Sequence, residues 1–331
     1  MGHLIKSKVA AYALFVAASW RPTPKEHTMH PVRFANQHLS LAGHLHLPAD
    51  LQAGVRYPTI VCVHPSGGVK EQTAGLYAAH LAKAGFIALA FDASYQGESE
   101  GEPRQLENPH VRVDDISAAV DYLITLAEVD PERIGVLGIC AGGGYATAAA
   151  MMDTRLKAIG TVSAVNYGQM YRQGWDKRGT PAESLALRDL AMAARTAEAT
   201  GAAIQYLPTT PLSREQGEQL HPDWAEAFDY YRTPRARHDN APSRLTTRSL
   251  AQLVTFDAFH QAELFLTQPL LLVAGSEAGT RWMSEALHQR AASAHKGLFI
   301  VEGATHIGLY DQPQWVDGAL TGLIPFFRTH L

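Results

Sequence analysis

The feature that most constrains the fold is a short stretch near the middle of the chain, residues 133–145. An apolar, β-branched run ends there in Gly138-x-Cys140-x-Gly142, and an alanine-rich segment follows at once. The apolar run predicts a buried strand, and the alanine-rich segment predicts a helix. A turn this sharp forces the two backbones together, so the glycines leave room where Cβ atoms would clash. The stretch predicts a strand–turn–helix unit with the Cys140 thiol exposed at its tip.

Cys140 has the setting of a nucleophile in this prediction. The N–H of Ala141 lies at the start of the new helix, where it can stabilise negative charge on a thiolate or on a substrate oxygen. The competing interpretation is a buried structural cysteine in a glycine-rich turn. The motifs upstream and downstream of the turn come in the order that a hydrolase requires, and they favour the catalytic interpretation.

Bulk composition excludes several function classes. With 331 residues and 46% apolar content, the chain can bury a large core, and we expect one domain with an insert. The net charge of −4 comes from mixed signs without basic runs, which argues against nucleic acid or a membrane surface as partner. A small-molecule substrate fits better. The two cysteines, Cys62 and Cys140, predict no disulfide framework, because pairing would consume the nucleophile.

Residues 1–30 form an N-terminal extension with two interpretations. Lys6 and Lys8 precede an apolar run over residues 9–20, and small residues stand at positions 17–19, as in a signal peptide. The alternative is an apolar helix that docks on the domain. We favour retention and a cytoplasmic location; cleavage of residues 1–19 would instead place the protein in the periplasm.

Strands and helices alternate along most of the remaining chain. Residues 31–34 and 39–47 predict an antiparallel hairpin at a sheet edge, and later continuous apolar runs predict strands covered on both faces. Asp114 and Asp115 are interpreted as charges at a helix start. The further predicted strands are residues 60–63, 86–91, 134–139, 157–164, 269–275 and 297–301. This order predicts an α/β fold with a mostly parallel central sheet flanked by helices.

Residues 166–265 interrupt the alternation with helical sequence that carries tryptophan and tyrosine. A structureless loop of this length would be improbable, so we predict an inserted helical cap on a core of residues 31–165 and 266–331. We expect Trp175 and Tyr231, together with Tyr95 of the core, to line the substrate pocket. The competing interpretation of the cap aromatics is that they form the cap's own core.

Two loops complete the predicted site. Residues 64–68, called the oxyanion loop below, follow the strand at 60–63, and the N–H of Ser66 or Gly67 can act as an oxyanion donor beside Ala141. His306 follows the last strand, at the same sheet edge as Cys140. Its position selects it from the 16 histidines of the chain.

These motifs resemble the α/β-hydrolase superfamily, and among its branches the dienelactone-hydrolase relatives, which use cysteine where most use serine. The similarity extends over about residues 32–327 and includes bacterial proteins and fungal polyketide transferases and thiohydrolases. The stretches that carry it are residues 64–72, 140–145, 303–306 and 309–311. The resemblance implies an α/β-hydrolase fold, a Cys-His-acid set, acyl or lactone chemistry, and neither a metal nor an organic cofactor.

The chain departs from the resemblance at two positions. Dienelactone hydrolase carries a glutamate at the start of the oxyanion loop that interacts with the resting thiol, and Pro65 stands in that place. The priming of the thiol must therefore differ. The usual acid stands about three residues after Gly275, where this chain has Ala278.

The third catalytic residue is open for this reason. Glu277 is the carboxylate that precedes the next predicted helix, and it is our prediction for the partner of His306. Asn166, at the end of the strand after the elbow helix, would give a Cys-His-Asn set instead. Asp311 is a further candidate.

The sequence thus predicts a cysteine-dependent hydrolase that attacks ester, thioester or lactone carbonyls and forms an acyl-enzyme. Acyl transfer to an acceptor other than water would use the same residues. A third hypothesis is a non-catalytic protein that binds a small ligand on a hydrolase scaffold. The sequence names neither the acyl group nor the oligomeric state, and a homodimer stays open.

Overall fold

One eight-stranded sheet organises the protein. The structure, a computed structural model, describes residues 27–331, so the signal-peptide and docking-helix predictions lie outside the described residues. The strands are β1 (His27–Asn36), β2 (Leu39–Pro48), β3 (Tyr57–Val63), β4 (Ile87–Phe91), β5 (Val129–Ile139), β6 (Leu156–Val162), β9 (Leu270–Gly275) and β10 (Lys296–Val301). Their order is β1-β2-β4-β3-β5-β6-β9-β10. β2 is antiparallel to both of its neighbours, and the other neighbouring pairs are parallel. The predicted mostly parallel sheet and the α/β-hydrolase fold are confirmed.

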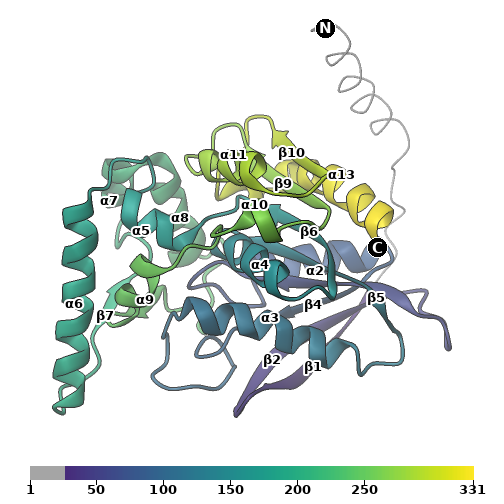
Figure 1. Cartoon of the computed structure of the whole chain (residues 1–331), viewed down its shortest axis with the longest axis horizontal. Coiled ribbons are helices and arrows are strands. Elements are labelled where there is room, and N and C mark those ends of the chain that lie inside the picture. Colours follow the sequence, from purple (N-terminus) through teal and green to yellow (C-terminus); the bar gives the residue numbers. More distant parts are fainter. Residues whose placement is uncertain (1–26) are drawn as a thin grey trace, which may run out of the picture.

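Helices cover both faces of the sheet (Figure 1). α3 (Pro109–Leu123), α4 (Ala141–Met152) and α11 (Arg281–Arg290) contribute to one apolar cluster. α2 (Thr73–Lys83) and α13 (Pro313–His330) contribute to the cluster on the other face. Because the central strands are buried on both sides, β3 and β4 have continuous apolar sequences rather than alternating ones.

The start of α3 differs from the prediction that Asp114 and Asp115 open a helix. α3 begins at Pro109, because Asn108 caps it and proline suits the first helical position. Asp115 lies inside the helix and is fully buried. Its carboxylate accepts hydrogen bonds from the N–H of Ser94 at 2.8 Å and from the Ser94 hydroxyl at 2.6 Å. Asp115 therefore ties α3 to the loop after β4.

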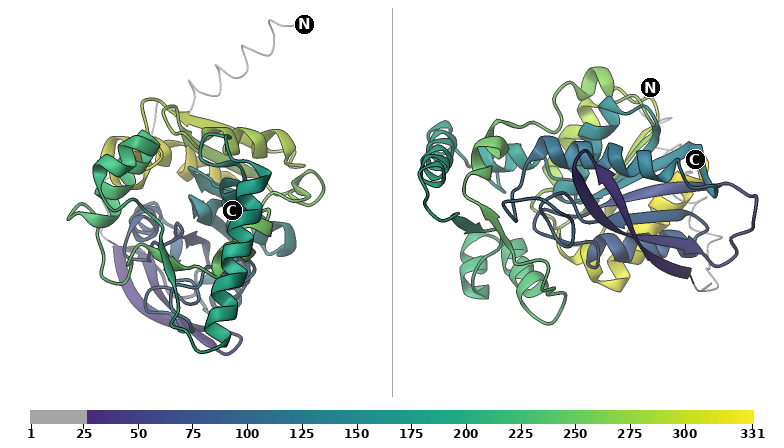
Figure 2. Two further views of the ribbon diagram at one scale, coloured as in Figure 1. Left: turned by 90° about the vertical axis from the view of Figure 1, so that its left-hand side faces the viewer. Right: turned by 90° about the horizontal axis from the view of Figure 1, so that it is seen from below.

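The chain leaves the sheet after β6 and returns at β9, and residues 166–265 between them are called the insert. Figures 1 and 2 show it at one side of the sheet, with α6 farthest from the core. Its elements are α5 (Tyr167–Gln173), α6 (Pro181–Ala199), β7 (Tyr206–Pro208), α7 (Arg214–Leu220), α8 (Pro222–Arg232), β8 (Arg244–Thr246), α9 (Ser249–Thr255) and α10 (Ala262–Phe265). A last short helix, α12 (Gly308–Asp311), follows β10. No helix within residues 27–331 has the length and apolar character needed to cross a membrane.

Candidate active site

Cys140 stands at the tip between β5 and α4. Its backbone has φ 56° and ψ −123°, a strained conformation for a residue with a side chain. A Cβ atom on Gly138 would lie 2.3 Å from the carbonyl oxygen of Gly142. One on Gly142 would lie 2.3 Å from the carbonyl oxygen of Val63. Only glycine fits these two positions, so the tight packing around them holds Cys140 at the end of β5.

The Cys140 sulfur hydrogen bonds to the N–H of Ala141 and to the hydroxyl of Tyr310. Burial raises the pKa of the Cys140 thiol to about 11, although both hydrogen bonds and the charge of Arg112 act in the opposite direction. The resting group at neutral pH is therefore the thiol. A thiol needs a base in order to act as a nucleophile.

His306 is fully buried in the loop after β10. Its Nε2 atom lies 3.0 Å from the hydroxyl oxygen of Tyr310, and its Nδ1 atom lies 2.6 Å from Oγ1 of Thr280. Burial lowers the pKa of His306 to about 4; the charge of Asp223 counteracts this effect, and His221 adds to it. The imidazole is therefore neutral at neutral pH and can accept a proton.

The structure does not bring Glu277 to His306. The Glu277 side chain is exposed, and its carboxylate accepts a hydrogen bond from the Ser276 hydroxyl at 3.2 Å. Its backbone N–H donates to the carbonyl oxygen of Ala304 at 3.0 Å, in a tight loop that leaves the side chain outside. Thr280, three residues further on, takes the position beside Nδ1 that we predicted for Glu277.

The two other candidate partners of His306 also have contacts elsewhere. Asn166 caps α5 by accepting a hydrogen bond from the N–H of Gln169, and its amide donates to Asp257 at 2.5 Å. Asp311 accepts two hydrogen bonds from the guanidinium of Arg235, at 2.6 and 2.8 Å. Both side chains therefore stabilise the insert and its attachment.

Asp223, in the first turn of α8, is the buried carboxylate nearest to the His306 loop. It accepts hydrogen bonds from the N–H of His306 at 3.4 Å, from the N–H of Gly279 at 2.8 Å and from Nε1 of Trp175 at 2.9 Å. It therefore joins the loops after β9 and β10 to the insert. Sequence reasoning missed both Asp223 and Thr280; the position of Asp223 next to a helix start indicates only a capping charge.

The predicted pocket residues have different positions. The ring of Trp175 lies against that of His306, with centroids 4.9 Å apart and an angle of 63° between the planes. The hydroxyl of Tyr231 hydrogen bonds to that of Tyr310. Both predicted aromatic residues of the insert thus lie beside the His306 or Tyr310 ring. Tyr95 instead packs against a glycine of its own loop.

A core residue contacts the oxyanion loop on one side, and a residue of the insert covers it. His64 is buried, and its Nε2 atom accepts a hydrogen bond from the N–H of Ala93 at 3.1 Å. Gly67 has φ 70°, and a Cβ atom there would lie 3.0 Å from Oγ1 of Thr209 in the insert. Within residues 27–331, no hydrogen bond uses the N–H groups of Ser66 and Gly67.

A buried ion cluster anchors the chain that follows the oxyanion loop. The Nζ atom of Lys70 lies 2.6 Å from Glu71, 2.9 Å from Asp92 and 2.7 Å from Glu98. Burial lowers the pKa of the Lys70 ammonium, but the carboxylates outweigh this effect and raise it above its ordinary value. The three carboxylates are close enough to hold a metal ion, but the ammonium pairs with all of them. We therefore interpret the cluster as a structural tie to the end of β4.

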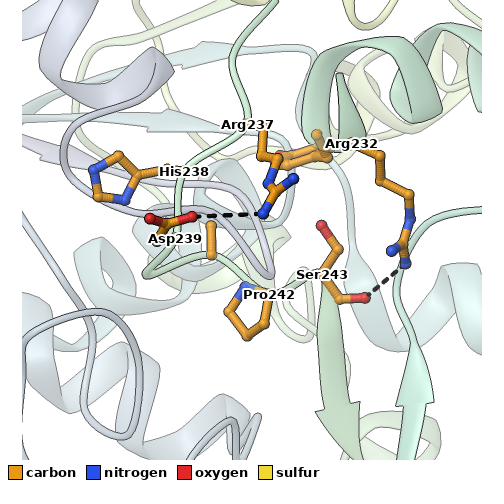
Figure 3. A pocket seen from close by; sticks show the side chains of 8 residues that line it. Arg232, Arg237, His238, Asp239, Pro242 and Ser243 are labelled. Carbon is orange, nitrogen blue, oxygen red and sulfur yellow. Dashed lines mark hydrogen bonds and ion pairs between the residues drawn. The ribbon is translucent and has the colours of Figure 1, made fainter. Parts of the chain in front are cut away.

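A pocket of about 270 Å³ opens in the insert beside Tyr231 (Figure 3). Arg237 pairs with Asp239 at its edge, and Arg232 donates to the carbonyl oxygen of Ser243 at 3.3 Å. The same carbonyl accepts the N–H of Thr209, the residue that covers Gly67. The pocket therefore shares Tyr231 with the surroundings of Tyr310, and its lining residue Ser243 is hydrogen-bonded to the residue that covers Gly67.

The chain is similar to known proteins in sequence and in fold. The model of the dienelactone hydrolase family matches residues 42–188. The uncharacterized protein YcjY of Escherichia coli (strain K12) is 48% identical over 296 residues, which cover 89% of this chain and 96% of that protein. The crystal structure of hypothetical protein PA2218 from Pseudomonas aeruginosa matches with a TM-score of 0.84 at 33% identity, over 96% of this chain and 97% of that one. Acyltransferase drtE of Aspergillus calidoustus is 27% identical over 83% of this chain and 88% of that protein.

Proposed function

The chain belongs to the dienelactone hydrolase family, and we propose that it hydrolyses ester, thioester or lactone carbonyls through an acyl-enzyme on Cys140. The observation that supports this proposal is the strained position of Cys140 at the turn. Its sulfur contacts the N–H of Ala141 and the hydroxyl of Tyr310, and that hydroxyl contacts His306. A nucleophile, an oxyanion donor and a neutral base thus converge at one end of β5. The architecture is that of acyl transfer by nucleophilic catalysis.

The proposed reaction has two halves. In the first, the Cys140 sulfur bonds to the carbonyl carbon, the thiol proton passes to His306, and the carbonyl electron pair moves to oxygen. The N–H of Ala141, with that of Ser66 or Gly67, stabilises this oxyanion. The imidazolium then protonates the leaving group as its bond to carbon breaks. In the second half, water attacks the acyl-enzyme while His306 takes its proton. The bond between carbon and sulfur then breaks, the imidazolium returns the proton to sulfur, and the acid is released.

The strain at Cys140 argues against a protein that only binds a small ligand. A residue with a side chain at φ 56° costs on the order of 1–3 kcal/mol. A binding protein gains nothing from this cost, whereas a nucleophile gains exposure of its sulfur at the turn.

Acyl transfer to another acceptor stays the alternative because it uses the same acyl-enzyme. The name of the fungal relative, an acyltransferase, favours keeping it. Insert residues also cover the site: Trp175 lies on His306, and Thr209 lies on Gly67. Such a cover can keep water from the acyl-enzyme until an acceptor binds.

Incubation with p-nitrophenyl esters tests the proposal. We expect release of p-nitrophenol and, in rapidly quenched samples, an acyl group on the peptide that contains Cys140, as found by mass spectrometry. Cys140→Ala should lose both signals, whereas the matched control Cys62→Ala should keep them. An alcohol added as acceptor distinguishes transfer from hydrolysis through the ester that it forms. Turnover by Cys140→Ala at the wild-type rate would refute the proposal.

A further inference from the structure

Tyr310 occupies the position between the proposed nucleophile and the proposed base. Its hydroxyl hydrogen bonds to the Cys140 sulfur and lies 3.0 Å from Nε2 of His306. Tyr310 is almost fully buried, with 1% of its surface exposed. No direct hydrogen bond joins Cys140 to His306 in the part of the chain that the structure describes. The shortest hydrogen-bonded path from sulfur to imidazole therefore runs through the Tyr310 oxygen.

We propose that the Tyr310 hydroxyl relays the proton between Cys140 and His306 during acyl transfer. The inference rests on the proposed function and adds a catalytic residue to it. When sulfur bonds to the carbonyl carbon, the S–H proton passes to the Tyr310 oxygen while the phenolic proton passes to Nε2. The phenol is neutral before and after the step, and the imidazole has gained one proton and become an imidazolium. When the bond to the leaving group breaks, Nε2–H returns a proton to the Tyr310 oxygen while the phenolic proton passes to the leaving group.

The hydrogen-bond capacity of each group allows this arrangement. A phenol donates one hydrogen bond and accepts up to two. Tyr310 can accept from the Cys140 thiol and from the Tyr231 hydroxyl while it donates to Nε2 of His306. The Nδ1–H of the same imidazole then donates to Thr280. Each proton on the path from the sulfur to the imidazole thus has an acceptor, which is the condition for proton transfer along that path.

The fold holds the Tyr310 ring in place. The ring of Tyr230, from the insert, contacts the Tyr310 ring edge-on with centroids 5.2 Å apart. The ring of Tyr231, also from the insert, contacts it edge-on with centroids 6.5 Å apart. The insert therefore packs against the ring on the side of these two tyrosines.

A relay explains how the site works although Nδ1 has a neutral partner. In the tautomer that the relay requires, Thr280 accepts the Nδ1–H, and its hydroxyl offers no negative charge to an imidazolium. Asp223 is the charge that favours the imidazolium, and His221 opposes it. Because Tyr310 passes its proton while it receives another, neither a buried tyrosinate nor a free thiolate has to form.

Tyr310→Phe tests the relay with Tyr77→Phe as matched control. Each variant loses one buried hydroxyl near α12, but only Tyr310 touches sulfur and imidazole. We expect Tyr310→Phe to lower kcat/KM for p-nitrophenyl acetate by about 100-fold or more, the range for loss of a proton-transfer group. It should also slow the alkylation of Cys140 by iodoacetamide and raise the apparent pKa of that reaction. Tyr77→Phe should stay within about threefold of wild type.

Coupling to the base is the second part of the test. If the relay operates, both residues act on one proton path. Iodoacetamide should then alkylate Cys140 in the double variant Tyr310→Phe/His306→Gln no more slowly than in the slower of the two single variants. Losses that multiply would overturn the relay, as would a Tyr310→Phe enzyme within threefold of wild type in both assays. If Tyr310→Phe strongly lowers the melting temperature, a protein with 3-fluorotyrosine at residue 310 is used instead of that variant. An unchanged pH dependence of Cys140 alkylation in this protein would then overturn the relay.

Failure of the proposed function gives a different result. Wild-type protein that forms no acyl adduct with any ester would refute the hydrolase proposal. Alkylation of Cys140 requires no acyl substrate, so the same variants still decide whether Tyr310 couples the thiol to His306.

Discussion

The hydroxyl oxygen of Thr280 lies 2.6 Å from Nδ1 of His306, where the sequence predicted a carboxylate. A hydroxyl can fix the tautomer and orientation of the ring, but it adds no negative charge. That charge comes from Asp223, which raises the pKa of His306 and belongs to the insert. In the proposed mechanism two residues therefore supply orientation and charge, which one acid often supplies alone.

Thr280→Val should lower kcat/KM by roughly tenfold to a hundredfold, because a buried Nδ1–H without a partner costs about 1–3 kcal/mol. Glu277→Gln should stay within about twofold of wild type, since the Glu277 side chain is exposed. Steady-state kinetics on p-nitrophenyl acetate compare the two variants. A loss of orders of magnitude in Glu277→Gln with a near-normal Thr280→Val would restore Glu277 as the partner.

Asp223→Asn should weaken His306 as a base. Removal of the charge takes away an effect that raises the pKa of His306, so this pKa should fall below its value of about 4. The acid limb of the kcat/KM profile reports that pKa in the free enzyme and should move to lower pH, while the plateau rate drops. An unchanged acid limb would show that Asp223 acts only through its hydrogen bonds to the two loops.

Iodoacetamide should modify Cys140 and leave Cys62 unmodified in the native protein. Cys62 is fully buried in β3, and burial raises the pKa of its thiol far above the ordinary value. Cys140 is partly exposed. Mass spectrometry of peptides after partial alkylation checks the order. Loss of activity with modification of Cys62 alone would contradict the role of Cys140.

Trp175→Leu should change the ratio of rates on long and short acyl esters by about tenfold, the range for a reshaped apolar pocket. The Trp175 ring contacts His306 and its Nε1 atom donates to Asp223, so the side chain lies at the site as well as in the insert. Rates on p-nitrophenyl esters of increasing chain length measure the change. Unaltered selectivity together with a large fall in melting temperature would favour a role in the core of the insert.

His46→Phe should make stability less sensitive to acid. His46 is buried with no partner for either ring nitrogen within the described chain, and burial, with His27 and His44, lowers its pKa to about 4. The unfolded chain binds this proton below about pH 6.5, so the folded state loses about 2 kcal/mol by pH 5 from this group. Urea unfolding at pH 7.5 and pH 5 should show a smaller difference for the variant. Equal differences would contradict the prediction.

The sequence by itself determined the strands of the sheet and the turn at Cys140, because the causes of both are local. Apolar runs of strand length and the glycines at 138 and 142 act through contacts between residues close in the chain, so the Cys140 turn and the mostly parallel sheet could be predicted. The loop position of His306 followed from the order of the strands.

Only the tertiary structure decided which side chains surround His306. Asp223 bonds to a residue 83 positions away, and no periodicity relates the two. Glu277 and Thr280 differ by three positions, and the packing of their loop against Ala304 selects between them. Partners of this kind depend on where two distant backbones meet, whereas a strand or a turn depends on its neighbours in the chain. That difference explains why the sequence could propose Cys140 and His306 as nucleophile and base but indicated neither Thr280 beside the His306 ring nor Tyr310 between the two.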